Sequence, residues 1–461
     1  MAGDSFTIWD TVSPIDFRYP QIELVPYLSE GAFIKYKLRV ELALVQALHK
    51  LGLCDSEVVD EVKKACAKVT TQDVYDEEGR IRHDIRALVN CIQLLVSEAV
   101  KPLIHRSATS FDISDTANVA RFREAIQNVV MPALIQLERI LIEITEREAE
   151  TLQIGRTHGQ HAVPITFGFA MAQYVDRFGE SIIEIKRLNN QLVGKFSGAV
   201  GAYNASSILF DDPEEFERTV LSFLCLKPAR ISTQIVHPES MLRLLAEVVT
   251  AAGIMANIAR DMRNLQRTEI AEVGEEFERE QVGSSTMPQK RNPINFENVE
   301  SMWKILVGRI QTVRLDQLSD HQRDLTNSAS SRTYGEIICY FLEMTNRLER
   351  TMWKLQVDKR NLRRNFEMTK GMIVAEPLYI ILAALGHPDA HEVVREITLK
   401  AQRESRNLED VAQEDAGLKP YFEKMTSRQR EILSDPALYI GIAPQKAHKA
   451  ATYWRKALNI K

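Results

Sequence analysis

The feature that most constrains the fold is a set of long stretches in which apolar side chains recur every three or four residues. The clearest stretch begins after His237 and Pro238. Its apolar positions are Met241, Leu244, Val248, Ala251, Met255, Ile258, Met262 and Leu265. This spacing places the side chains on one face of an α-helix. The helix would make about seven turns and extend roughly 40 Å at 1.5 Å per residue.

The same periodicity predicts four more long helices. They cover residues 119–144, 167–185, 293–318 and 335–355. Pro132 interrupts the first of these, and we expect it to kink that helix rather than end it. Segments with the strict alternation of a β-strand are few. The pattern therefore predicts an all-α protein built on a long antiparallel helical bundle.

Shorter and more broken helical patterns flank this bundle. We expect an N-terminal helical domain, a central long-helix bundle and a C-terminal helical domain, at residues 1–110, 111–356 and 357–461. The apolar faces of the long helices exceed what one chain is expected to bury, which predicts a homo-oligomer. The alternative is that all of these faces are covered within the chain.

The composition argues against two classes of partner. The net charge is −5 and the pI is near 6.1, so bulk electrostatics do not favour nucleic-acid binding. The longest apolar run, residues 378–385, is far shorter than a membrane span. The first ten residues lack the pattern of a signal peptide. We therefore expect a soluble cytoplasmic protein that binds neither nucleic acid nor membrane.

The cysteines do not suggest a metal site or a disulfide framework. They are scattered, odd in number and without metal-ligand spacing, at Cys54, Cys66, Cys91, Cys225 and Cys339. This usage predicts buried thiols in a reducing compartment.

Residues 283–293 form the most informative local motif, Gly-Ser-Ser-Thr-Met-Pro-Gln-Lys-Arg-Asn-Pro. One glycine and two prolines disfavour regular helix, so a loop is expected. Its chemical groups are Ser284, Ser285, Lys290 and Asn292. Lysine suits a carboxylate through charge and asparagine through hydrogen bonds. The alternative, a plain surface turn, does not explain so long and ordered a string.

A second motif, Gly-Arg-Thr-His-Gly-Gln-His at residues 155–161, lies just before the helix predicted at residue 167. His158 is a candidate acid or base, because imidazole titrates near neutral pH. A loop histidine considered alone is more often structural. Its combination with the serine-containing loop favours the catalytic interpretation.

Together the two motifs resemble the signatures of the fumarase/aspartase superfamily, lyases that eliminate fumarate from a substituted succinate. Gly159-Gln160 after His158 is typical of the adenylosuccinate lyase branch. Further segments resemble that branch in order and spacing, at residues 13–19, 82–84, 105–116, 197–201, 232–234 and 322–332. One departure is Arg106-Ser107, where the family often has an aromatic residue and a glycine. This departure leaves the use of His105 open.

The resemblance implies an anti β-elimination of purine biosynthesis. Fumarate would be released from adenylosuccinate, giving AMP, and from the succinylaminoimidazole carboxamide ribotide. Ser284 would take the proton from the succinyl Cβ, and His158 would protonate the departing nitrogen. Glu297 would pair with the histidine and fix its tautomer. No metal and no organic cofactor is implied, because the elimination needs only acid–base groups and an electron-accepting carboxylate.

The resemblance also implies a set of substrate-binding residues. Arg18, Arg323 and Arg332 offer planar guanidinium groups suited to phosphate. Thr109 and Ser110 would hold a succinyl carboxylate. The other candidates are Tyr19, Arg82, His83, Asp84, His105, Thr157, Gln234, Ser285, Met287, Lys290, Asn292 and Ser328.

In the related enzymes, the serine loop, the histidine segment and the Thr-Ser segment come from different subunits of a homotetramer, and the resemblance implies the same here.

Two alternative functions remain. The first is another fumarate-releasing lyase of the superfamily, acting on argininosuccinate or aspartate, for which the phosphate-binding arginines would have no use. The second is a helical scaffold without activity, against which the intact Ser284, His158, Lys290 and Asn292 argue.

Overall fold

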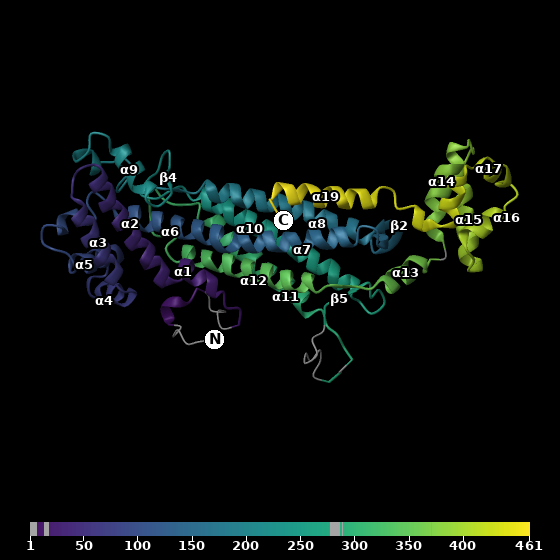
Figure 1. The fold of residues 1–461 in the computed structure, drawn as a ribbon, viewed down its shortest axis with the longest axis horizontal. Coiled ribbons are helices and arrows are strands. Elements are labelled where there is room, and N and C mark those ends of the chain that lie inside the picture. The colour runs from purple at the N-terminus through teal and green to yellow at the C-terminus, as the bar shows by residue number, and fades with distance from the viewer. Residues whose placement is uncertain (1–6, 13–17, 277–285, 288, 370) are drawn as a thin grey trace. The chain divides into compact units, whose positions relative to one another are not determined.

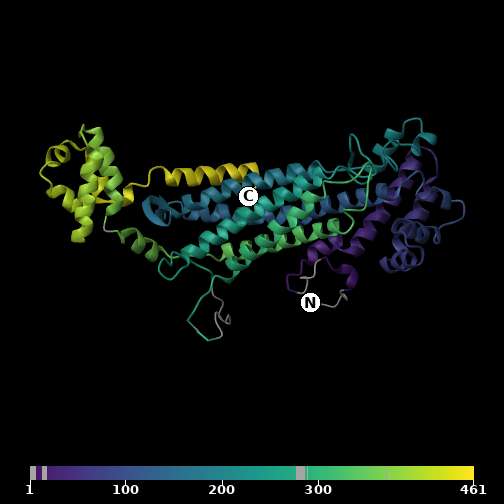
Figure 2. The same cartoon turned by 180° about the vertical axis from the view of Figure 1, so that it is seen from behind.

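Helices make up most of the described chain, and several of them are long (Figure 1, Figure 2). The computed structural model describes residues 7–12, 18–276, 286–287, 289–369 and 371–461. Unit 1, one of two compact units, comprises residues 1–134, 181–253 and 301–346. Unit 2 comprises residues 135–180, 254–300 and 347–461. The division into three domains at residues 110 and 356 stays a prediction.

Five long helices lie where the apolar periodicity predicts them, and each contributes residues to both units. They are α7 (Met131–Arg147), α8 (Phe167–Asn190), α10 (Glu239–Leu265), α11 (Ile294–Leu315) and α12 (Tyr334–Trp353). Val248, Met255 and Ile258 of α10 are fully buried. Burial of such a face contributes about 25 cal/mol per Å² of apolar surface, which is why the spacing specifies the helices. The predicted helical fold class is confirmed.

Pro132 does not end its helix, as predicted. α6 (Ser110–Ala125), the π-helical segment η4 (Ile126–Val130) and α7 form one continuous run. Pro132 is the second residue of α7. The wider π-helical turn directly before it accommodates a residue that has no backbone N–H to donate.

α2 (Glu30–Lys50) organises the packing of unit 1, where it contacts α3, α6 and α9. Leu44 and Leu48 of α2, Phe122 of α6 and Phe216 of α9 are fully buried. The remaining elements of this unit are η1 (Ile8–Asp10), η2 (Ile22–Leu24), α1 (Val25–Leu28), α3 (Ser56–Lys68), α4 (Thr71–Ile81), α5 (Asp84–Gln93), η3 (Lys101–Leu103), β3 (Val193–Gly194), η5 (Ser206–Ile208), α9 (Pro213–Ser222), β4 (Lys227–Pro228) and η6 (Ser330–Thr333).

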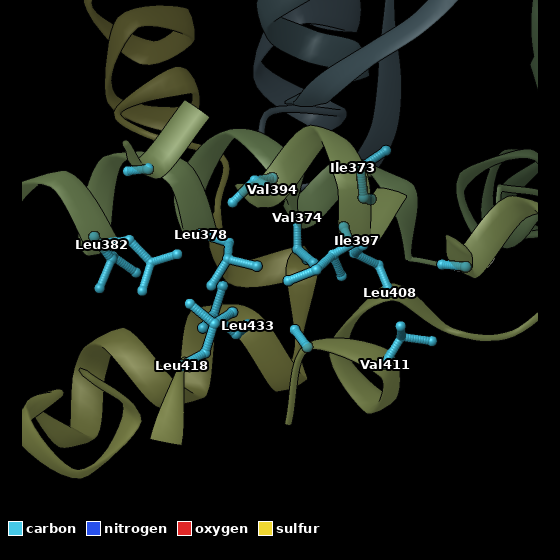
Figure 3. Packing of buried hydrophobic residues seen from close by; sticks show 14 of the residues in the cluster. Ile373, Val374, Leu378, Leu382, Val394, Ile397, Leu408, Val411, Leu418 and Leu433 are labelled. Carbon is cyan, nitrogen blue, oxygen red and sulfur yellow. The ribbon is translucent and has the colours of Figure 1, made fainter. Parts of the chain in front are cut away.

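The short helices of unit 2 enclose a separate hydrophobic core (Figure 3). Leu378 of α14 lies against Leu418 and Leu433, and Ile397 of α15 lies near Leu408. The helices of this group and its neighbours are α13 (Lys359–Glu367), η7 (Met372–Val374), α14 (Ala375–Ala384), α15 (Ala390–Glu404), α16 (Leu408–Glu414), α17 (Lys419–Lys424), α18 (Ser427–Ser434), η8 (Pro436–Leu438) and α19 (Ala443–Ala457).

Three two-stranded sheets accompany the helices in the described part of the chain. β1 (Leu152–Thr157) and β2 (Gln160–Thr166) form an antiparallel hairpin. β3 and β4 pair in parallel, whereas β5 (Val273–Gly274) and β6 (Gln356–Val357) pair antiparallel. The sequence patterns did not reveal these short strands.

The prediction of buried thiols holds for only part of the cysteine set. All five cysteines are free, and Cys91 and Cys339 are buried. Cys225 is exposed, because it lies in a tight turn after α9 and adopts a positive φ of 55°. Cys54 and Cys66 are half-buried.

Two helical runs, Ser110–Arg147 and Glu239–Leu265, are long and apolar enough to cross a membrane by length and composition. About half of the most apolar window is buried inside the chain in each, 50% and 56% respectively. Such burial is the property of helices in the core of a soluble protein, so their apolar character reflects packing.

Glu138 is a fully buried carboxyl on α7, and neither of its oxygens has a hydrogen-bond partner in the part of the chain that the structure describes. Burial raises the pKa of Glu138 well above its usual value, and the nearby Asp176 carboxylate adds to this effect. Above the unfolded-state pKa of about 4.5, the folded chain therefore keeps a proton that the unfolded chain releases. Stability falls as the pH rises through this range.

A Glu138→Gln variant is expected to unfold at a higher temperature than the parent at about pH 8, because glutamine has the same shape and cannot ionise. Each kcal/mol gained would raise the midpoint by roughly 2–4 °C. Near pH 5 the difference should shrink. Thermal unfolding at both pH values measures the effect, with Glu143→Gln on the same helix as the control. A lower midpoint for Glu138→Gln at the higher pH would contradict the expectation.

Candidate active site

His158 lies at the tip of the β1–β2 hairpin, in unit 2. His158 and Gly159 form a two-residue turn, with φ values of 54° and 75°. Positive φ at both central positions is the property of a type I′ turn, which matches the twist of the strands. His158 is exposed. The turn therefore presents the imidazole to the surroundings of the chain rather than to its core.

Buried polar contacts anchor this hairpin. Arg156 donates from both terminal guanidinium nitrogens to Glu272, with one contact of 3.0 Å from Nη1 to Oε2. Gln153 Nε2 donates to Glu272 Oε2 at 3.0 Å, and Asn365 Nδ2 donates to Oε1 at 2.8 Å. Glu272 is completely buried. A charge-assisted bidentate pair of this kind is rigid and directional, so it fixes the strand that leads to His158.

A β-bulge between Ile154 and Arg156 explains the glycine of the motif. A Cβ atom at Gly155 would lie 2.7 Å from the carbonyl oxygen of Val163 on the opposite strand. The residue pattern predicted only a loop before a helix at this place. The alternation of Leu152 and Ile154 and the turn glycine were the available signals for a hairpin.

The described part of the serine-containing motif is non-helical, as predicted, and leads into α11. Ser284 and Ser285 lie outside the described residues. Met287 and Lys290 are exposed, whereas Asn292 is half-buried. Lys290 donates its backbone N–H to the carbonyl of Met287 at 3.0 Å.

Glu275 caps the start of α11 from outside that helix. Its carboxylate accepts the backbone N–H groups of Asn295 and Phe296, each at 3.0 Å, and the Asn295 side-chain amide at 2.8 Å. Arg347 Nη1 donates to Asn295 Oδ1 at 2.9 Å. A carboxylate at a helix N-terminus is favoured by the orphan N–H groups and by the helix dipole. This contact fixes the backbone that follows Asn292.

Glu297 is exposed on the first turn of α11. Its ion pair with Arg263 is long, at 3.9 Å between Nη2 and Oε1. No hydrogen bond or ion pair joins Glu297 to His158 among the residues that the structure describes. Thr157, beside His158, is also exposed. The predicted pairing of Glu297 with the histidine stays a prediction.

The N-terminus of α6 carries the Thr-Ser pair in unit 1. Thr109 is the N-cap and donates its backbone N–H to Asp112 Oδ2 at 2.8 Å. Asp112 also forms a completely buried ion pair with Lys195 and accepts the backbone N–H of Gly198 at 3.2 Å. One carboxylate thus ties the helix start that bears Thr109 and Ser110 to the glycine-rich segment at residues 197–201.

Arg323 and Gln234 meet beside α6. Arg323 Nη1 donates to Gln234 Oε1 at 3.1 Å, and the guanidinium lies over the ring of Phe111. Gln234 Nε2 donates to the carbonyl of Ala199 at 3.1 Å. Among the described residues, no carboxylate forms an ion pair with Arg323. The charges of Asp115, Asp84 and Asp324 reach Arg323 without forming an ion pair, so the guanidinium keeps N–H donors for a ligand.

Asp115, one turn along α6, supports the segment of Gln234. It accepts the backbone N–H of Val236 at 2.6 Å. Burial raises the pKa of Asp115 to about 6, while the bond from Val236 and the charges of Lys195 and Arg323 act in the opposite direction. Asp115 is half-buried. It belongs to the segment at residues 105–116 that resembles the family, where sequence reasoning assigned it no role of its own.

The Arg-His-Asp element forms the junction between α4 and α5. Arg82 is exposed and left-handed, with φ 59°. His83 is the N-cap of α5, and its Nδ1 accepts the backbone N–H of Arg86 at 3.2 Å. Lys37 Nζ lies 3.2 Å from Asp84 Oδ2. Burial opposes ionisation of Asp84, but the Lys37 charge, the backbone N–H of Ile85 and the hydrogen bond from Lys37 together outweigh it and lower the pKa of Asp84.

His105 meets a buried carboxylate of α2. Its Nδ1 lies 2.7 Å from Glu41 Oε1, and its backbone N–H donates to Oε2 at 3.1 Å. His105 and Ser107 both have positive φ values, 58° and 60°. Ser107 thus adopts the left-handed conformation that glycine adopts most readily, at the position where the resemblance leads us to expect glycine.

The remaining phosphate candidates lie at the surface of unit 1. Arg18, Ser328 and Arg332 are exposed, and Tyr19 is half-buried. Arg332 Nη1 lies 3.4 Å from Glu30 Oε2. No contact between described residues joins Arg18 or Arg332 to Arg323, so a three-arginine clamp stays a prediction. The described residues contain no group of three or more His, Cys, Asp or Glu side chains placed to hold a metal ion.

Comparison with known proteins identifies the family. Residues 25–308 match the family model described as "Lyase", and residues 319–429 match the model described as "Adenylosuccinate lyase C-terminal". The chain is 38% identical over 448 residues to the adenylosuccinate lyase of Pyrococcus horikoshii, covering 96% of this chain and 98% of the relative. The chain belongs to the adenylosuccinate lyase family. The Archaeoglobus fulgidus adenylosuccinate lyase is 34% identical, with 97% and 99% of the two chains covered.

A solved structure of an enzyme with another activity has a similar fold. The 3-carboxy-cis,cis-muconate lactonizing enzyme from Pseudomonas putida superposes with a TM-score of 0.83 and is 24% identical in sequence. The match covers 96% of this chain and 99% of that enzyme. At this level of identity the similarity concerns the fold alone.

Proposed function

We propose that this chain catalyses the anti β-elimination of fumarate from adenylosuccinate, giving AMP, and from the succinylaminoimidazole carboxamide ribotide of purine biosynthesis. The observation that carries the proposal is Arg323. Its guanidinium is positioned by Gln234 and Phe111 and forms no ion pair with a carboxylate among the described residues. A prepositioned cation suits the phosphate of a nucleotide, and an argininosuccinate lyase would not need it.

The chemistry assigned to individual side chains is part of the same proposal. Ser284 takes the proton from the succinyl Cβ, and His158 protonates the departing nitrogen. A serine hydroxyl is a poor base unless it is ionised, so donors and the Lys290 charge in a water-poor site must stabilise the alkoxide. Lys290 and Asn292, together with Thr109 and Ser110, bind the succinyl carboxylates.

A cytoplasmic homotetramer with shared active sites completes the proposal. His158 and Glu297 are both exposed and make no contact with each other in the described part of the chain, so their pairing would form between subunits. The long helices also expose large apolar side chains, including Ile183, Ile305 and Val307. Such faces favour association with further copies of the chain.

The first test is turnover. The absorbance of the purified protein with adenylosuccinate should change as AMP forms, and argininosuccinate and aspartate should give no reaction. Turnover of argininosuccinate, with none of adenylosuccinate, would favour the alternative lyase.

Shared active sites predict complementation between inactive variants. A His158→Gln subunit and a Ser284→Ala subunit, mixed under conditions that allow exchange, should regain part of the parental activity, because some hybrid sites contain neither substitution. The recovered rate and the subunit exchange are measured on the same mixture. An exchanged but inactive mixture would place each active site within one chain.

A further inference from the structure

Glu41 and His105 form a contact to which the proposed mechanism assigns no role. Glu41 lies on α2 and is completely buried. It accepts two hydrogen bonds from a single residue, one from the ring Nδ1 of His105 and one from its backbone N–H. A buried carboxylate without a cation would be costly, so this geometry favours the imidazolium form of His105.

The surroundings of the His105 ring support the charged form. The negative charge of Asp112 on α6 favours protonation of the ring, whereas the positive charge of Arg86 on α5 opposes it. Cys66 of α3 lies near Glu41. Burial lowers the pKa of His105, but the charge and the hydrogen bond of Glu41 outweigh it, and the pKa rises above its usual value. The imidazole therefore stays protonated to higher pH than a free histidine.

The second ring nitrogen of His105, Nε2, is available as a hydrogen-bond donor. Nδ1 is occupied by Glu41, and Nε2 has no hydrogen-bond partner within the described ranges. The His105 side chain is 21% exposed, whereas Glu41 is 0% exposed. The imidazolium therefore has the buried Glu41 carboxylate on one side and a partly exposed N–H group on the other.

We propose that Glu41 is a positioning residue that keeps His105 protonated, so that the Nε2–H group of His105 binds an anionic oxygen of the substrate. This inference rests on the proposed function for the identity of the substrate. The oxygen belongs either to a carboxylate of the succinyl group or to the phosphate. The imidazole of His105 changes its charge near neutral pH, so the strength of this contact depends on the protonation of His105.

The test compares product inhibition in the parent and in Glu41→Gln between about pH 6 and pH 9. Glutamine keeps an acceptor for the His105 N–H groups and removes only the charge. Fumarate carries carboxylates alone and AMP carries a phosphate alone, so the two inhibitors separate the two sources of the anion. Inhibition by one of them should weaken measurably above neutral pH in Glu41→Gln, because the pKa of His105 falls when the Glu41 charge is removed.

Glu217→Gln is the matched control, because Glu217 is also buried in unit 1 and accepts one backbone N–H and one side-chain hydroxyl. Unchanged inhibition by both products in Glu41→Gln, or an equal loss in Glu217→Gln, overturns the proposal. Failure of the parent to turn over adenylosuccinate is a separate result and counts against the proposed function.

A measurement on the parent protein covers the case in which Glu41→Gln does not fold. A proton NMR titration of the histidine rings, with His105→Gln to identify the relevant signal, reports the protonation of His105 directly. Titration of that signal above about pH 6.5, the usual histidine value, is expected. Titration below it overturns the proposal, whatever the activity of the enzyme.

Discussion

A His158→Gln variant is expected to bind adenylosuccinate within a few-fold of the parent while its turnover falls by about 10²–10⁴-fold, the usual contribution of a general acid. The side chain is exposed on a two-residue turn, so glutamine fits without repacking. Glutamine retains shape and hydrogen bonding and cannot deliver a proton to the departing nitrogen. Steady-state kinetics combined with calorimetric binding of substrate separates these two effects.

The neighbouring histidine provides the control for this experiment. His161 lies on β2 opposite Arg156 in the strand register and is half-buried. Burial lowers the pKa of His161, and the Arg156 charge lowers it further, so this ring is neutral at neutral pH. His161→Gln should keep turnover close to that of the parent. A His158→Gln rate within about threefold of the parent, well short of the usual range, would remove His158 from the mechanism.

Ser284→Ala is expected to abolish the elimination and leave substrate affinity within a few-fold of the parent. The hydroxyl is needed only while the Cβ–H bond breaks, and a group used only in the transition state affects turnover without affecting ground-state binding. The measurement is again kcat together with calorimetric substrate binding. The role of Ser284 rests on its position in the sequence motif, because Ser284 lies outside the described residues.

Ser285→Ala is the comparison within the same motif. Its hydroxyl is expected to bind a substrate carboxylate, so the substitution should mainly raise KM. Sequence spacing alone does not show which of the two adjacent serines is the base, whereas comparison of the two variants does. If Ser284→Ala retains near-parental turnover while Ser285→Ala loses it, the base is Ser285.

The long helices and the family could be predicted from the sequence because both depend on local information. The apolar positions of α10 recur along one helical face, and burial of that face decides the structure wherever the helix packs. The motifs at residues 155–161 and 283–293 carry the family resemblance in consecutive residues. The full-length similarity to adenylosuccinate lyases confirms the family that those motifs predicted.

Only the tertiary structure showed which side chains support the site, because these partners are distant in sequence. Asp112 and Lys195 are separated by 83 positions, and His105 and Glu41 by 64. In the sequence each of them is an ordinary charge on a helix or beside a glycine-rich turn. Their pairing is decided by burial, since an ionised group removed from water must find an opposite charge or a hydrogen-bond donor, and the fold determines which one is within reach. The hairpin that presents His158 was likewise decided by the fold, through the buried contacts of Glu272 with Arg156 and its neighbours.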